Sequence, residues 1–478
     1  MMIMKLLRRT GLVCAAAAVL SLLPPPFSSL LRPSSLLAQE MRTPEHPPPP
    51  GERGSENLRV LSHIPLGYQQ SISDIEIEQD MDRPFVYIAR RMQTIGFDVI
   101  DVSDPENAKV LKRWRIENPE LHQGGAMDGR YFKHEGRYYY VQSFQFRQGG
   151  PDTDLGAIVF DVTDLANGGE IQEVGRMRQP DTPGGFHNIF VYKHSSGKPL
   201  LFATSGTYAK IFDLDLFLKG DQSEMDAVTA DEETRYLVGR VPLAPTDNPW
   251  SRGYHDFYIA YHAESGQDRF YGAGGSGYYV FNVTDLKNPE LLATVLNVPG
   301  VAWGHTFTPS PDGRYAIGET EWQYQPLRVF DLKPALDGEV DNIDHAISAW
   351  HADWKTLAHN HEVRWPYVFV SGYETGLSVF TLEDPHNPRT VAYYDTFDGP
   401  HSSRAARREG GPYTWGVYDG AWGVDVRNAD GLIVVSDMTT GFWAFKMDGF
   451  DGWDGSQYDV PNVSSAQDWD ENPSTRTD

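Results

Sequence analysis

Four histidines stand at one position of a repeated segment, and each precedes a run of alternating apolar residues. They are His187, His255, His305 and His359. We expect His122 to lead the corresponding segment before them, and His361 to face the same side as His359, because strand residues two apart do so. Neutral imidazole binds copper, iron and zinc, so these six side chains predict a transition-metal site where they converge.

Polar residues beside these histidines extend the candidate site. An amide or a carboxylate directly follows three of them: Asn188, Asp256 and Asn360. Strict strand alternation predicts that these three point to the opposite face. Glu319 and Glu321, in the sequence GETE, share one strand face near His305. These two carboxylates are candidates for a general acid or base, for ligands of a hard metal, or for a solvated strand edge.

Other kinds of site are excluded by the residue types. The chain's single cysteine, Cys14, lies in an N-terminal apolar segment, so the mature protein has no thiol nucleophile, thiolate ligand or disulfide. Gly272, Gly274 and Gly277 have the spacing G-x-G-x-x-G, but a strand rather than a helix follows them, so we expect no nucleotide cofactor.

The elements that must position the histidines are repeated strands. One apolar strand with a following turn occurs seven times, with its central apolar residues 49 to 69 positions apart. The copies are GFDVIDVSDPENA from Gly96, GAIVFDVTDL from Gly156, AKIFDLDLF from Ala209, GYYVFNVTDL from Gly277, LRVFDLKPAL from Leu327, GLSVFTLEDPHNP from Gly376 and GFWAFKMDGF from Gly441. A hairpin precedes most copies and a further strand follows, which makes four strands per unit. Seven such units predict an all-β, seven-bladed β-propeller.

The ends of the repeat predict how the ring closes. Leu58 to Gly67 resembles the outer strand of a unit whose first part is missing, and the copy at Gly441 lacks that outer strand. We therefore expect the N-terminal strand to complete the last blade. The predicted divisions are a signal peptide at 1–38, a Pro-rich linker at 39–57, the propeller at 58–453 and an acidic disordered tail at 454–478. Extra length at Asp215–Trp250 and Asp398–Tyr418 predicts loops over one face.

The phrases GLSVFTLEDPHNP, HNHEVRWPYVFVSGYETGLSVF and GAWGVDVRNADGLIVVSDMTTGFWAF resemble the LVIVD-repeat family of secreted β-propellers. The likeness covers about residues 58–450 and implies the propeller fold and secretion. It implies no particular chemistry.

The N-terminal residues and the charge bear on location and partners. Lys5, Arg8 and Arg9 precede the apolar run from Gly11 to Leu23, which is the pattern of an export signal and is too short for a membrane span. We expect a periplasmic, extracellular or cell-surface protein without stable membrane insertion. A net charge of −25 disfavours nucleic acid as a partner. We expect a monomer that binds a small molecule or a protein.

Three functions remain open on these observations. The first is a metal-binding propeller that holds copper, iron or zinc, with a metal-dependent oxidoreductase as the favoured kind of enzyme. The second is a non-catalytic interaction scaffold, in which the repeated histidines serve the blades alone, as they do in WD-repeat propellers. The third is an extracellular hydrolase or lyase that uses Glu319 or Glu321 as its acid or base.

Overall fold

The computed structural model describes residues 53–67, 70–122, 124–146, 152–179, 183–220, 236–243, 253–354, 356–398, 418–455 and 469–470. The chain divides into two compact units, Met1–Pro47 and Pro48–Asp478. The first unit, with the expected signal peptide, lies outside the described residues, as does much of the expected linker and tail.

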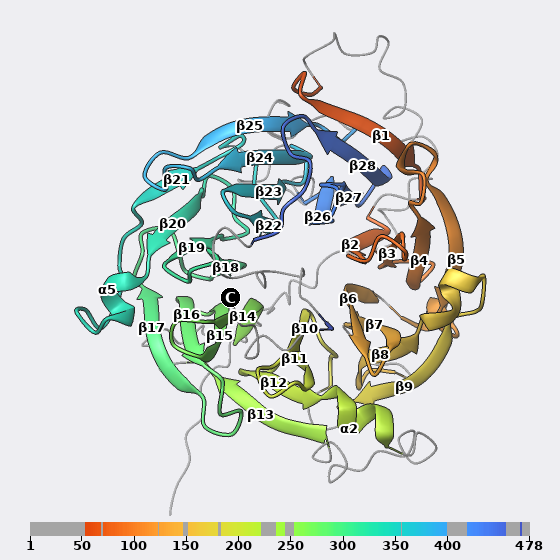
Figure 1. Ribbon diagram of the computed structural model, residues 1–478, viewed down its shortest axis with the longest axis horizontal. Helices are drawn as coiled ribbons and strands as arrows, with labels where there is room; N and C mark the ends of the chain where they lie inside the picture. The colour runs from red at the N-terminus through yellow and green to blue at the C-terminus, as the bar shows by residue number, and fades with distance from the viewer. Residues whose placement is uncertain are drawn as a thin grey trace, which may run out of the picture. The chain divides into compact units, whose positions relative to one another are not determined.

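The described part of the second unit is a ring of seven four-stranded antiparallel sheets, as Figure 1 shows. Blade 1 is β2 (Ile72–Ile77), β3 (Phe85–Arg90), β4 (Gly96–Asp101) and β5 (Lys109–Arg115). Blade 2 is β6 (Ala126–His134), β7 (Arg137–Phe144), β8 (Leu155–Asp161) and β9 (Gln172–Arg178). Blade 3 is β10 (Ile189–Lys193), β11 (Pro199–Ser205), β12 (Tyr208–Asp213) and β13 (Leu237–Pro242). Blade 4 is β14 (Tyr254–His262), β15 (Gln267–Gly274), β16 (Gly277–Asn282) and β17 (Glu290–Leu296). Blade 5 is β18 (Phe307–Pro309), β19 (Tyr315–Gly318), β20 (Leu327–Asp331) and β21 (Ser348–Trp350). Blade 6 is β22 (Asn360–Arg364), β23 (Tyr367–Ser371), β24 (Leu377–Thr381) and β25 (Arg389–Tyr394), and blade 7 is β26 (Ala421–Val426), β27 (Ile433–Asp437), β28 (Gly441–Met447) and β1 (Leu58–Ile64).

Helices are few in the described ranges. The α-helices are α2 (Leu214–Lys219) and α5 (Lys333–Leu336), and three 3₁₀ turns are η2 (Pro105–Asn107), η3 (Pro119–Leu121) and η4 (Thr163–Asn167). None of the helices that the structure describes has the length and hydrophobicity needed to cross a bilayer.

The predicted seven-bladed ring and its closure are confirmed. The N-terminal strand β1 pairs antiparallel with β28, from Leu58 opposite Met447 to Ile64 opposite Phe442. In Figure 1 the two ends of the ring meet at this pair. Each repeated strand of the sequence is the third strand of a blade, where residues on both faces are buried against neighbouring sheets. That burial explains why these strands contain nearly continuous apolar runs.

The expectation that two long insertions form loops over one face is wrong for the first of them. The stretch from Asp215 to Trp250 contains α2 and the strand β13, which completes blade 3. This insertion therefore supplies a strand of a blade and is not a single loop. Residues 399–417 of the second insertion lie outside the described residues.

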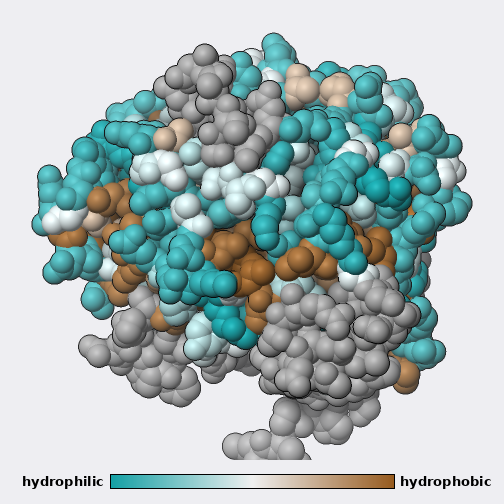
Figure 2. Space-filling view, turned by 60° about the horizontal axis from the view of Figure 1, so that its bottom comes forward, coloured by the Kyte–Doolittle hydropathy of each residue, from teal (hydrophilic) through white to brown (hydrophobic). Residues whose placement is uncertain are grey.

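The surface is largely polar, as the acidic composition suggests. Figure 2 shows hydrophilic residues over most of the visible face, with hydrophobic residues gathered in a band across its middle. Four residues of the expected tail are described, 454, 455, 469 and 470. Trp469 is buried against Phe132, and its carbonyl accepts a hydrogen bond from Lys193. This part of the tail therefore packs on blades 2 and 3.

A buried carboxyl group stabilises the turn between β27 and β28. Asp437 accepts hydrogen bonds from the Thr439 and Thr440 amides at 2.9 and 2.8 Å and from the Thr396 hydroxyl at 2.7 Å. Burial nevertheless raises the pKa of Asp437 to about 7, because desolvation outweighs these hydrogen bonds. The folded protein thus binds a proton at Asp437 more tightly than the unfolded chain does.

We expect this group to make stability depend on pH. Because its folded pKa is raised, its contribution is fully present below about pH 4 and is lost as the pH rises through about 7. The free energy of unfolding of the wild type, minus that of Asp437→Asn, should fall by roughly 2–4 kcal/mol between pH 4 and 8. Denaturant titrations across this range measure the difference. The exposed Asp344→Asn is the control, and a pH-independent difference for Asp437→Asn would contradict the expectation.

Candidate metal centre

The four histidines of the repeat meet across blades 3 to 6 at one end of the channel. His187 Nε2 lies 3.0 Å from His255 Nε2. The ring centroids of His255 and His305 are 4.0 Å apart, and those of His305 and His359 are 5.0 Å apart. Each histidine stands at or just before the innermost strand of its blade, so ring closure brings equivalent positions side by side.

A carboxylate joins this histidine row. Glu321 Oε2 lies 3.6 Å from His305 Nε2, and His255, His305 and Glu321 offer ligand atoms that all lie within 4.8 Å of one another. Glu321 comes from the connection between β19 and β20, and its side chain is 25 % exposed. The other oxygen of this carboxylate accepts a hydrogen bond from the Tyr373 hydroxyl.

Hydrogen bonds to the outer two histidines set their tautomers. His359 Nδ1 lies 2.7 Å from the Trp422 carbonyl oxygen, and His187 Nδ1 lies 3.0 Å from Gln145 Oε1. Since both partners are acceptors, each Nδ1 carries the proton and donates it. Each Nε2 then keeps a lone pair, which for His187 points at His255.

The inner two histidines have ring nitrogens without partners. His255 Nδ1 and His305 Nε2 are buried and make no hydrogen bond. Burial, and then the neighbouring imidazoles, hold the pKa of both histidines well below the ordinary value. Burial lowers the pKa of His359 to about 3. His255, His305 and His359 are therefore neutral at pH 7, which is the state in which imidazole binds metals.

His361 and Glu319 lie behind the row. His361 Nδ1 is 3.6 Å from Glu319 Oε2, and Glu319 Oε1 is 3.9 Å from His305 Nδ1. Both side chains are almost completely buried, and burial lowers the pKa of His361 to about 3 and raises that of Glu319 well above its usual range. Glu319 thus contacts the row from behind and does not reach the surface, where a polymer would bind.

His122 does not lead an inner strand, so its predicted position is wrong. Pro119 begins the turn η3, His122 ends it, and β6 starts only at Ala126. The His122 ring stacks on Phe146 with centroids 4.0 Å apart and lies 3.4 Å from Asp152. The equivalent of the other histidines in blade 2 is Met127, which packs in an apolar cluster with Leu357, Tyr373, Trp422 and Met438.

The residues after the histidines also face the channel, contrary to strict alternation. In blade 4, His255 is an extra residue between the Tyr254–Gly274 and Asp256–Ala273 pairs, and Trp422 is the extra residue in blade 7. Such a β-bulge changes the direction of the side chains that follow it. Asp256 therefore lines one small cavity, and Asn188 and Asn360 line the same cavity with Glu76, Glu362 and Asp425.

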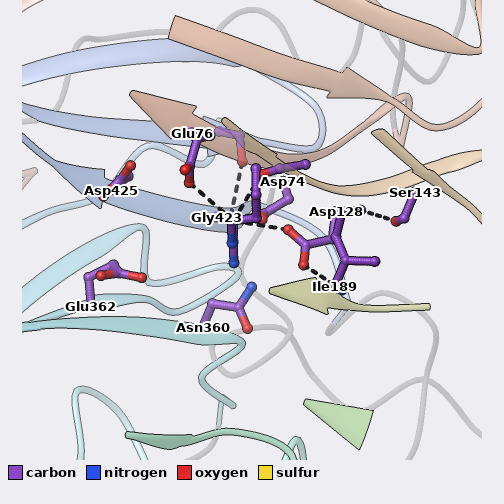
Figure 3. Close-up of polar contacts among 12 residues, drawn as sticks. Asp74, Glu76, Asp128, Ser143, Ile189, Asn360, Glu362, Gly423 and Asp425 are labelled. Carbon is purple, nitrogen blue, oxygen red and sulfur yellow. Dashed lines mark hydrogen bonds and ion pairs between the residues drawn. The ribbon is translucent and has the colours of Figure 1, made fainter. Parts of the chain in front are cut away.

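This second layer is acidic, and the sequence reasoning missed it. Figure 3 shows Asp74, Glu76 and Asp128 close together, with Glu362 and Asp425 in the same region. Arg130 Nη1 lies 3.0 Å from both Asp74 and Asp128, and Arg364 pairs with Glu362 at 3.0 Å. The available signal was the repeat itself, because acidic residues recur one and three places after the histidine position.

The comparisons with known proteins concern the fold alone. No family model and no curated protein matches the sequence. The structure is similar to the crystal structure of Raptor from Chaetomium thermophilum, with a TM-score of 0.50 and 10 % identity. The match covers 84 % of this chain and 30 % of that protein. At this identity the likeness supports the propeller and says nothing about its site.

The backbone that leads into β10 of blade 3 depends on one hydroxyl. Thr204 Oγ1 accepts the amide hydrogens of both His187 and Asn188, each at 3.0 Å. In Thr204→Val two amides lose their partner at nearly constant volume, which should lower the free energy of unfolding by about 1–3 kcal/mol. Thr204→Ser keeps the acceptor and should lose clearly less. Denaturant titration compares the two variants, and a Thr204→Val variant as stable as the wild type would contradict the expectation.

Proposed function

We propose that this protein binds a transition metal at the end of its channel, with His255, His305 and Glu321 as ligands. The observation that carries the proposal is that two imidazoles from adjacent blades have buried, unpartnered nitrogens and form a group with one carboxylate. A buried polar atom without a partner costs free energy, and such atoms in a native fold call for an explanation. A bound cation supplies it here.

The tautomers of the neighbouring imidazoles support the same conclusion. His187 Nε2 keeps a lone pair and lies 3.0 Å from His255 Nε2, so His255 Nε2 carries a proton and donates it to His187. His255 Nδ1 then keeps the lone pair that a metal ligand needs. His187, itself held by Gln145, orients the His255 ring in the way that hydrogen-bond partners of metal-binding imidazoles do.

The types of ligand in the proposed site indicate which metal it binds and which kind of reaction it supports. Two histidines and one carboxylate with open positions are the ligand set of non-haem iron(II) oxygenases, while imidazole donors also suit copper and zinc. We therefore favour iron(II) and a redox reaction on a small molecule. In the proposed site, neutral imidazoles bind the ion. Burial raises the pKa of Glu321 to about 7, and a bound cation favours the ionised carboxylate. The partly exposed Glu321 side chain faces the solvent from which a substrate arrives.

We propose export as the setting of this activity, as expected from the N-terminal 38 residues. Membership of the LVIVD-repeat family stays a proposal of the same kind, supported by the repeat phrases and by the propeller fold.

Metal analysis tests the proposal. The full chain, purified without a His-tag or chelator and reconstituted with Fe(II), Cu(II) or Zn(II), should bind one ion per chain. The double variant His255→Asn/His305→Asn should lose at least tenfold in metal affinity, because two of the proposed ligands are gone. Plasma mass spectrometry and equilibrium titration measure content and affinity.

The control is the double variant His262→Asn/His345→Asn, which removes two histidines that lie outside the row, one of them on the same strand β14 as His255. It should bind metal like the wild type. A wild type that takes up none of the three ions would return the histidines to a structural role in the blades and would favour the interaction scaffold.

A further inference from the structure

The two carboxylate oxygens of Glu321 contact different side chains. Oε1 accepts the hydroxyl hydrogen of Tyr373, while the described contact of Oε2 is His305 Nε2, 3.6 Å away. One oxygen is thus anchored, and the other is directed at the proposed metal position. On the basis of this contact, and resting on the proposed function, we propose that Tyr373 is a positioning residue that orients Glu321 as a metal ligand.

The backbone at Tyr373 is held in an unusual conformation. Its φ is +46°, in the left-handed region that favours glycine. Eight described residues other than glycine have positive φ, and Tyr373 is the buried one among them, with 1 % exposure. The glycines Gly372 and Gly376 stand close by in the same turn, so a tyrosine at this position points to a role for its side chain.

Neighbouring blades fix Tyr373 from both sides. Its amide and carbonyl both pair with Ala421 at the start of β26 in blade 7, at 2.9 Å each. Its ring lies 5.0 Å from the His359 ring. The hydroxyl therefore reaches Glu321 of blade 5 from a backbone that is tied to blade 7. This arrangement fixes the carboxylate relative to histidines of other blades.

Other buried tyrosine–carboxylate pairs in the ring differ from this one in the hydrogen bonds that the carboxylate oxygens accept. Tyr192 donates to Asp268 Oδ1 at 2.6 Å, but Ser195 donates to both oxygens of that carboxylate. Tyr87 donates to Glu78 at 2.6 Å, and Arg83 binds both oxygens of Glu78. In these two pairs both oxygens are occupied by hydrogen-bond donors, whereas Glu321 directs its second oxygen at an imidazole.

Tyr373→Phe tests the role, with Tyr192→Phe as the matched control. Both variants remove one buried hydroxyl that donates to a carboxylate. Cobalt(II) is the probe, because its visible absorption reports the ligand set as well as the affinity. In Tyr373→Phe the freed carboxylate should weaken cobalt binding by about 10- to 100-fold and change the spectrum. Tyr192→Phe should bind within twofold of the wild type with an unchanged spectrum.

A double-mutant cycle makes the test specific to the proposed contact. In the Glu321→Gln background the ligand is already impaired, so adding Tyr373→Phe should change cobalt affinity by less than twofold. Full additivity of the two substitutions would overturn the inference, because the hydroxyl would then act elsewhere.

The outcomes separate the two proposals. A wild type that binds no cobalt, iron, copper or zinc overturns the metal site itself. A wild type that binds, together with an unchanged affinity and spectrum in Tyr373→Phe, overturns only the role of Tyr373. Failure of Tyr373→Phe to fold, when Tyr192→Phe folds, would assign the hydroxyl to the fold and would also overturn the role.

Discussion

The pairing of β1 with β28 is the interaction on which the rest of the structure depends. It joins the two ends of the chain's repeats, so that every innermost strand has a neighbour on both sides around the channel. An open array would leave strand edges exposed and would not hold seven equivalent positions around one axis. The contacts between side chains of different blades, including the histidine row, follow from this closure.

Closure also places polar side chains in a confined space around the channel. These side chains form two layers, one of imidazoles and one of carboxylates. At one end the polar groups are imidazoles, which burial keeps neutral. In the adjoining layer they are carboxylates, compensated in part by Arg130 and Arg364 and in part by raised pKa values; burial raises the pKa of Glu362 to about 7. Neutral imidazole nitrogens are metal donors, so the imidazole end of the channel suits a cation.

The site is assembled from several blades rather than from one motif. His187, His255 and His305 come from three successive blades, Glu321 comes from a connection of blade 5, and Tyr373 reaches it from blade 6. A rigid ring is suited to this task, because metal ligands must be held with little freedom and each of these residues lies in or near a paired strand. Part of the site reaches the surface, because the Glu321 side chain is 25 % exposed and His255 is only partly buried, which leaves the metal position accessible from the solvent.

By itself the sequence determined the fold, the number of blades, the closing strand and the phase of four histidines. These features could be predicted because the apolar strand is repeated, and each copy has the residue pattern of the same buried environment. It could not determine that His122 belongs to a turn while Met127 takes its place, because a turn beginning at Pro119 shifts the strand start by a few residues. Nor could it determine that Asp256 joins the channel beside His255, because the bulge at His255 depends on pairing with the next strand. Tertiary structure alone decided that His255, His305, Glu321 and Tyr373 meet, since contacts between blades arise only when the ring is closed.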